Sequence, residues 1–197
     1  MMKKWMGIVI IFVGIGLIAY PFYMEYEQNK EVRALEEAME LIMSADEGED
    51  IDLSEIDNLP FTEDEIRNVM ELEIPYLNIR HKVLDTTTTH NLNVALTQIK
   101  ENQTPGEGNF TIAGHRGYRD GRHFSNLAEV PIGEEVYLHV GSTKYIYQIT
   151  DRDVIEATDV HVLDDREGID ELTMITCTIT GKQRVAVRAK LLDIVSG

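Results

Sequence analysis

The sequence predicts a mainly β protein whose globular part is a closed, antiparallel-rich barrel with short helices. Some seven or eight short runs with strand character follow one another from residue 70 onward, separated by turn residues. The last two runs, 172–177 and 184–192, flank six residues that include a glycine, which is typical of a β-hairpin. Patterns long enough for extended helices lie only before residue 45.

The expected elements of the globular part can be placed in order. They are strands 70–74 and 78–84, a short helix 89–100, a strand 110–114, a polar loop 117–123, a helical turn 124–130, a hairpin of 135–140 with 144–151, a long acidic connection 154–172, and the final hairpin. About 130 residues are enough to bury one hydrophobic core.

Residues 5–24 contain no charge and are long enough to cross a bilayer. We expect an uncleaved transmembrane anchor, because the run exceeds the core of a signal peptide and no small-x-small cleavage pattern follows it. Lys3 and Lys4 should keep the N-terminus in the cytoplasm, so that the rest of the chain lies outside. The predicted domains are therefore the anchor at 1–24, an acidic stalk at 25–65 and a globular domain at 66–197.

The formal charge of −17 is unevenly distributed. Sixteen of the 35 acidic residues lie between 25 and 65, where only Lys30 and Arg33 are basic. Such a chain offers no basic face for phosphates, so nucleic acid is not expected as a partner. The stalk begins with apolar residues at helical spacing and contains further apolar residues after residue 50. It can pack on the flank of the globular domain or lie across its active site.

The only cysteine, Cys177, ends a strand of the final hairpin. A two-residue loop at Thr180–Gly181 would pair Ile179 with Lys182 and Cys177 with Arg184, about 5 Å apart between Cβ atoms. An adjacent cation favours the nucleophilic thiolate and can stabilise developing negative charge. In an oxidising compartment a lone cysteine is either a buried packing residue or a reactive thiol, and the neighbouring arginine favours the second interpretation.

The proton carrier must be another residue, because arginine does not lose its proton. The best candidate is His115, which follows a short apolar strand that breaks at Gly114. A zinc site built from His115, His123 and Cys177 is an alternative without a close-spaced pair of ligands to support it. The remaining histidines are interpreted as surface or packing residues.

These residues carry a resemblance to the class A sortases. The shared motifs, in the same order and at similar spacing over residues 70 to 192, are Ala113-Gly114-His115, Phe124-Ser125-Asn126-Leu127, the segment 158–164, Thr173-Met174-Ile175-Thr176-Cys177, and Arg184. Agreement of several separated motifs is far more specific than the pentapeptide before the thiol alone. Met174 departs from the usual leucine, a nearly isosteric change. The resemblance implies the eight-stranded sortase barrel.

The resemblance also implies an activity. Cys177 would attack the carbonyl between Thr and Gly of a Leu-Pro-x-Thr-Gly-like sorting signal, His115 would act as acid and then base, and Arg184 would hold the substrate and its oxyanion. Partners would be cell-surface proteins with a C-terminal sorting signal and an amine of the peptidoglycan precursor lipid II, at a Gram-positive plasma membrane. The positions that match the substrate groove are Ala113, Val160, Val162, Leu163, Ile175 and Thr176.

Some class A sortases bind calcium, and this chain departs from their pattern. The matching loop residue is Asp165, but the upstream positions are Lys100, Gln103 and Glu107, and a lysine and a neutral amide do not suit calcium. No cofactor is therefore expected. A weak site in the acidic connection stays open, with candidate ligands Asp159, Asp164, Asp165, Glu167, Asp170 and Glu171.

Two other hypotheses remain at this point. The chain can be a sortase of another class, such as a class D-like enzyme, with a specialised substrate. It can also be a non-catalytic anchored module in which Cys177 is structural or redox-active.

Overall fold

The computed structural model describes residues 2–44, 52–117 and 121–197, and it divides into two compact units, Met1–Thr62 and Glu63–Gly197. In the first unit, helix α1 (Met2–Ser44) is continuous through Pro21 and is followed by a short 3-10 turn, η1 (Leu53–Glu55). One apolar stretch of α1 is long enough to cross a membrane, with a mean hydropathy of 2.2 and no burial inside the protein. The predicted end of the stalk helix at 45–50 lies outside the described residues.

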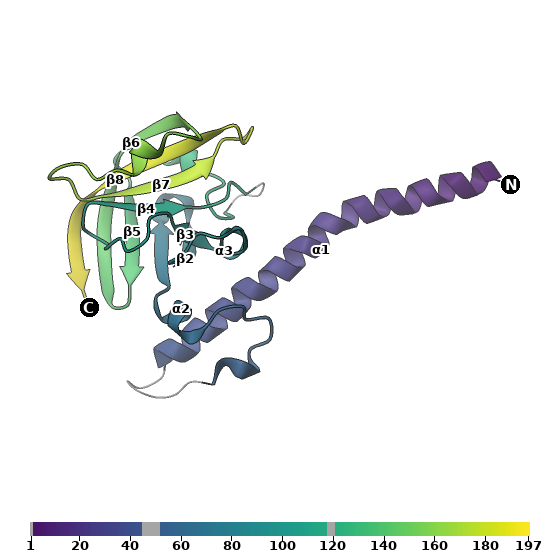
Figure 1. Cartoon of the computed structure of the whole chain (residues 1–197), viewed down its shortest axis with the longest axis horizontal. Coiled ribbons are helices and arrows are strands. Elements are labelled where there is room, and N and C mark those ends of the chain that lie inside the picture. The colour runs from purple at the N-terminus through teal and green to yellow at the C-terminus, as the bar shows by residue number, and fades with distance from the viewer. Residues whose placement is uncertain (1, 45–51, 118–120) are drawn as a thin grey trace. The chain divides into compact units, whose positions relative to one another are not determined.

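The second unit is a closed barrel of eight strands, which confirms the predicted fold (Figure 1). The strands are β1 (Met70–Ile74), β2 (Ile79–Leu84), β3 (Leu96–Gln98), β4 (Asn109–Ala113), β5 (Glu135–Val140), β6 (Thr143–Glu156), β7 (Glu171–Cys177) and β8 (Gln183–Ser196). Their order around the barrel is β1-β2-β3-β4-β7-β8-β6-β5. Pairs β2–β3 and β4–β7 are parallel, and the other pairs are antiparallel.

Short helices connect the strands. They are α2 (Glu63–Arg67), η2 (Pro75–Leu77), α3 (Thr89–Val94), η3 (Leu127–Glu129) and η4 (Val160–Leu163). The helix predicted over 89–100 is wrong in its second half, because α3 ends at Val94 and Leu96–Gln98 pairs as β3 with β2 and β4. All three residues of β3 are buried, so pairing and burial override the helical pattern.

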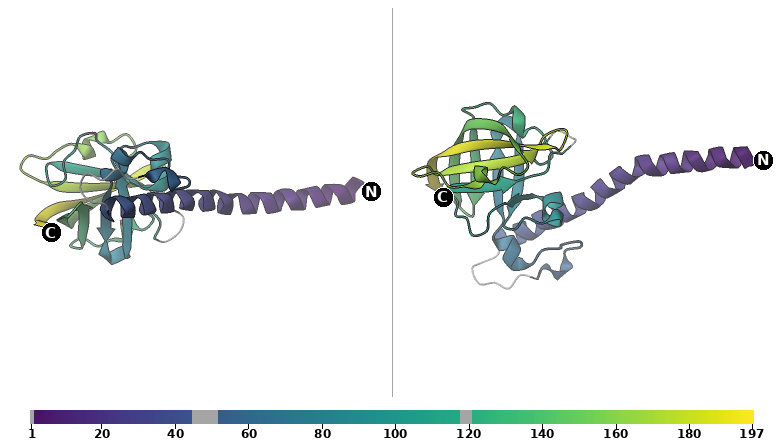
Figure 2. Two further views of the ribbon diagram at one scale, coloured as in Figure 1. Left: turned by 90° about the horizontal axis from the view of Figure 1, so that it is seen from below. Right: turned by 45° about the horizontal axis from the view of Figure 1, so that its top comes forward.

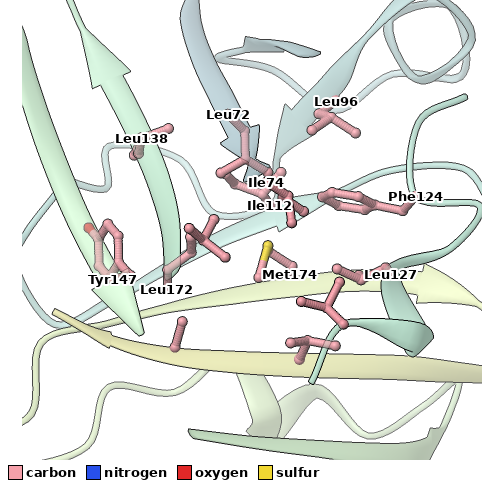
Figure 3. Packing of buried hydrophobic residues seen from close by; sticks show 14 of the residues in the cluster. Leu72, Ile74, Leu96, Ile112, Phe124, Leu127, Leu138, Tyr147, Leu172 and Met174 are labelled. Carbon is pink, nitrogen blue, oxygen red and sulfur yellow. The ribbon is translucent and has the colours of Figure 1, made fainter. Parts of the chain in front are cut away.

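The core lies inside the barrel and positions the strands that carry the candidate site. Figure 3 shows Ile112 of β4 with Leu172 and Met174 of β7 among the buried side chains of the interior. All three are fully buried, so Met174 fills the core as expected for a substitute for leucine. The two views of Figure 2 show the strands wrapped around this interior. The residues between these positions must therefore face away from the core.

Candidate active site

The ends of two parallel strands bring His115 and Cys177 to one edge of the barrel. Strands β4 and β7 pair in parallel up to Ala113 opposite Ile175, and the Gly114 amide donates to the Ile175 carbonyl at 3.0 Å. His115 and Cys177 each lie two residues beyond that last pair. His115 is exposed, and Cys177 is a free, half-buried cysteine. Neither side chain is enclosed in the interior, so both are open to a substrate.

The final hairpin places Arg184 opposite Cys177, as predicted. The loop itself differs from the prediction. The Gly181 amide donates to the Thr178 carbonyl at 2.9 Å, and the Thr178 amide donates to the Gln183 carbonyl at 3.0 Å, so four residues rather than two separate the paired ends. Gly181 has φ of 71°, which accommodates the longer loop without changing the pairing of Cys177 with Arg184.

Arg184 also holds the hairpin in place. Its Nη1 donates to the carbonyl of Gly181 and to that of Gln183, both at 3.1 Å. Among the described residues, no hydrogen bond joins the Cys177 thiol to His115 or Arg184. Catalytic hydrogen bonds are often long before a substrate binds. The arrangement therefore offers a thiol, an imidazole and a guanidinium at one edge of the barrel.

Three of the predicted groove residues are half-buried: Ala113, Leu163 and Ile175. Ala113 and Ile175 are paired, and they share the outer face of the barrel with Cys177 because side chains alternate along a strand. Val162 is only 4% exposed, whereas Val160 is 70% exposed. The structure thus places Ala113 and Ile175 on the thiol's face of the barrel, keeps Leu163 half-buried in η4 and leaves Val160 in solvent.

Thr176 lies on the opposite face of β7 from Cys177. It is 2% exposed, and its Oγ1 is buried without a hydrogen-bond partner. Its direct neighbours on the strand, Ile175 and Cys177, point outward. Thr176 therefore supports the strand from the barrel's interior and does not line the outer face.

The backbone around His115 is tightly confined. A Cβ on Gly114 would overlap a side-chain carbon of Leu96 and lie 2.7 Å from Phe124. The Phe124 amide donates to the His115 carbonyl at 3.1 Å, and Arg116 pairs with His123. The predicted loop 117–123 thus returns to the strand end that carries His115, although its residues 118–120 lie outside the described part of the chain.

The last residue of this loop, His123, is buried, and it lies beside the half-buried His81. The rings of His81 on β2 and His123 are 5.9 Å apart, and each has one buried ring nitrogen without a hydrogen-bond partner. Burial lowers the pKa of His81, and it lowers the pKa of His123 to about 4, helped by the nearby His81, Arg122 and His115. In both residues burial thus favours the neutral imidazole, consistent with packing residues.

Two residues at positions matched to the calcium ligands of some sortases, Lys100 and Asp165, bind each other. The Lys100 ammonium lies 2.9 Å from Asp165 Oδ1, and this hydrogen bond is the main reason that the pKa of Asp165 is lowered. Other acidic residues of the connection have internal partners: Asp170 accepts from the Gly108 amide, and Glu171 binds Arg166. Among the described residues, no group of three or more acidic, histidine or cysteine side chains could hold a metal ion.

Sequence reasoning missed the polar pair beneath the loop that carries η4. Asn109 and Thr173 are both buried, and they are joined by a 2.6 Å hydrogen bond from the Thr173 hydroxyl to Asn109 Oδ1. The alternation of side chains along the strands could have revealed this pair. The odd-numbered residues of β4 and β7 face away from the core, and the first two of them in each strand are polar.

Comparisons with known proteins agree with this geometry. A family model of the sortase domain matches residues 72–192. Sortase A of Bacillus anthracis is 30% identical over 178 residues, covering 87% of this chain and 84% of the relative. Sortase A of Staphylococcus aureus is 30% identical over 186 residues, covering 89% of each.

Solved structures show the same fold. Listeria monocytogenes sortase A matches with a TM-score of 0.62 and 27% identity, over 66% of this chain and 91% of that one. A Clostridium perfringens sortase D5 transpeptidase matches with a TM-score of 0.64 and 25% identity, over 84% and 99%. The chain belongs to the sortase family, and it is a cysteine transpeptidase with an eight-stranded barrel that follows an N-terminal apolar helix in the sequence.

Proposed function

We propose that this sortase cleaves a Leu-Pro-x-Thr-Gly-like signal between Thr and Gly and transfers the new carboxyl end to an amine. The observation that supports this most is the meeting of the ends of β4 and β7 with the start of β8, which places His115, Cys177 and Arg184 at one edge. Sortases act on surface proteins that carry sorting signals, so the substrate class follows the family.

The proposed reaction has two halves. His115 takes the proton of the Cys177 thiol as the sulfur attacks the threonine carbonyl carbon. A C–S bond forms, the carbonyl π bond opens to an oxyanion, and Arg184 stabilises that oxyanion. The C–N bond to glycine then breaks, and the departing amine takes a proton from His115. In the second half, His115 takes a proton from the incoming amine as it attacks the thioacyl carbon. The C–S bond breaks, and the released Cys177 sulfur regains a proton from His115. Water in place of the amine gives hydrolysis.

The substrate peptide is proposed to lie on the outer face of β4 and β7. Ala113 and Ile175 would form its floor, and Leu163 of the loop above would contact the apolar residues of the signal. Val160 and Val162 belong to the same loop, and Thr176 supports the floor from inside. No cofactor is proposed, because Lys100 occupies the Asp165 carboxylate.

The acceptor is proposed to be an amine of the peptidoglycan precursor lipid II. The N-terminal apolar helix suggests a membrane anchor, which would hold the enzyme beside a lipid-linked acceptor. With Lys3 and Lys4 on the cytoplasmic side, the barrel would lie outside a Gram-positive plasma membrane.

The test uses the full-length chain in detergent with a Leu-Pro-x-Thr-Gly peptide. Mass spectrometry should find an acyl adduct on the only thiol, and an added amine should release it as a transpeptidation product. Cys177→Ala should lose the adduct and peptide cleavage while keeping its thermal unfolding temperature. Retained cleavage in that variant would refute the proposed roles.

A class D-like specificity is the second candidate, because the Clostridium perfringens sortase D5 structure covers 84% of this chain. A panel of peptides that differ in the residues around the Thr-Gly bond separates the two. Preference for a signal other than Leu-Pro-x-Thr-Gly, with the same adduct on Cys177, would favour the second candidate.

A further inference from the structure

The loop that carries η4, residues 157–170 between β6 and β7, is joined to β4 by the buried side-chain amide of Asn109. Asn109 is 1% exposed, and its Nδ2 donates to the carbonyls of Val162 and Asp164 at 3.0 and 3.2 Å. Its backbone amide donates to Asp165 Oδ1 at 2.9 Å. A single residue of β4 therefore contacts three residues of the loop.

The orientation of this amide is fixed by its surroundings. The two loop carbonyls can only accept, so the NH₂ group must face them. Its oxygen then accepts from the Thr173 hydroxyl at 2.6 Å. Asn109 satisfies both side-chain donors and its acceptor in a buried site, where an unmet polar group is costly. Any loop position that breaks these bonds leaves buried polar atoms without partners.

We propose that Asn109 is a positioning residue: by holding the carbonyls of Val162 and Asp164, it keeps the η4 loop ordered over the outer face of β4 and β7 and thereby sets the affinity for the sorting signal. This inference rests on the proposed function. Asn109 does not itself reach the substrate, since the loop covers it. Its connection runs through Thr173 to β7, the strand that ends in Cys177.

The chain contains a matched control for the Thr173 hydroxyl. Thr111 of β4 pairs directly with Thr173, is equally buried, and also donates its hydroxyl to a side-chain amide oxygen, that of Gln103 at 3.0 Å. Gln103 Nε2 donates to the Thr111 carbonyl, and the Thr111 amide donates to Gln103 Oε1. Within the described residues, Gln103 forms no hydrogen bond to the η4 loop. Thr111→Val and Thr173→Val thus remove the same kind of bond at neighbouring positions, and only the second leaves Asn109 Oδ1 without its donor.

The experiment measures amide hydrogen exchange of residues 157–170 and steady-state cleavage of a Leu-Pro-x-Thr-Gly peptide by the full-length chain in detergent. Asn109→Asp replaces the donating NH₂ with an oxygen that faces two carbonyls. It should speed exchange in the loop and raise KM about tenfold with little change in kcat, the equivalent of losing one to two buried hydrogen bonds. Thr173→Val should do the same to a smaller degree, about threefold to fivefold.

Thr173→Ser keeps the hydroxyl and should restore the wild-type KM, whereas Thr111→Val should leave loop exchange and KM unchanged. If Asn109→Asp does not fold, the Thr173 and Thr111 variants decide the question. Equal KM changes in Thr173→Val and Thr111→Val, or faster loop exchange with unchanged KM, would overturn the proposal. Failure of the wild type to form an acyl adduct would instead refute the proposed function, and the exchange measurement would still report whether Asn109 orders the loop.

Discussion

Replacing His123 with asparagine should remove an acid-sensitive part of the barrel's stability. His123 is 8% exposed and sits at φ of 46°, a left-handed conformation that asparagine tolerates. Burial is the main reason that its pKa falls to about 4, and electrostatic interactions with His81, Arg122 and His115 lower the pKa further. A backbone hydrogen bond to Asn93 opposes this only in part.

The sign and size of the change in unfolding free energy with pH follow from proton linkage. In the unfolded chain the imidazole binds a proton as the pH falls through about 6.5, whereas in the folded chain it resists until about pH 4. Acidification therefore favours unfolding over that window. A difference of about 2.5 pKa units corresponds to about 3 kcal/mol of unfolding free energy. This stability is present above about pH 6.5 and is lost by about pH 4.

The assay is urea unfolding at a series of pH values, followed by near-ultraviolet circular dichroism of the aromatic side chains. Wild type should lose about 3 kcal/mol more than His123→Asn between about pH 7 and pH 4, because other titrating groups are common to both proteins. His161→Asn, which changes an exposed histidine, is the control and should follow wild type. Parallel pH profiles for wild type and His123→Asn would show that the buried imidazole is not held neutral, and the reasoning would be refuted.

Three further changes test the site. Gly114→Ala adds a Cβ 2.7 Å from Phe124, so it should destabilise the fold by about 1–3 kcal/mol and lower kcat by moving the His115 backbone, as thermal unfolding and peptide cleavage can measure. Arg184→Lys keeps the charge but loses the planar guanidinium with its several N–H donors, and kcat/KM for the peptide should fall about 10²-fold or more. A near-normal kcat/KM would show that Arg184 does not stabilise the oxyanion. Lys100→Met leaves Asp165 without its ammonium partner, so KM for the peptide should rise severalfold. Millimolar calcium should leave cleavage by the wild type unchanged, and activation by calcium would contradict this expectation.

The sequence was sufficient for the parts of the molecule that depend on local pattern. The final hairpin was predicted with Cys177 opposite Arg184, because alternation and the distance to Gly181 determine the pairing even when the loop is longer than expected. The strand β3 was missed, since three residues carry too little periodicity to outweigh the helical start at Thr89.

Contacts between distant segments were beyond such reasoning. The Lys100–Asp165 ion pair joins residues 65 positions apart, and sequence comparison could note only that a lysine is unsuited to calcium. The Asn109–Thr173 bond spans 64 positions and depends on the parallel pairing of β4 with β7. No local pattern encodes which strands become neighbours, so these polar partners emerge only with the topology.

The same parallel pairing explains why three separate segments can form one site. Because β4 and β7 run in the same direction, the residues that follow both strands leave the barrel at one edge, and the antiparallel β8 begins there. Backbone pairing, not contacts among His115, Cys177 and Arg184, therefore brings these side chains together. Substituting Cys177 or His115 should for that reason leave the barrel intact, so that a loss of turnover in such variants measures chemistry rather than folding.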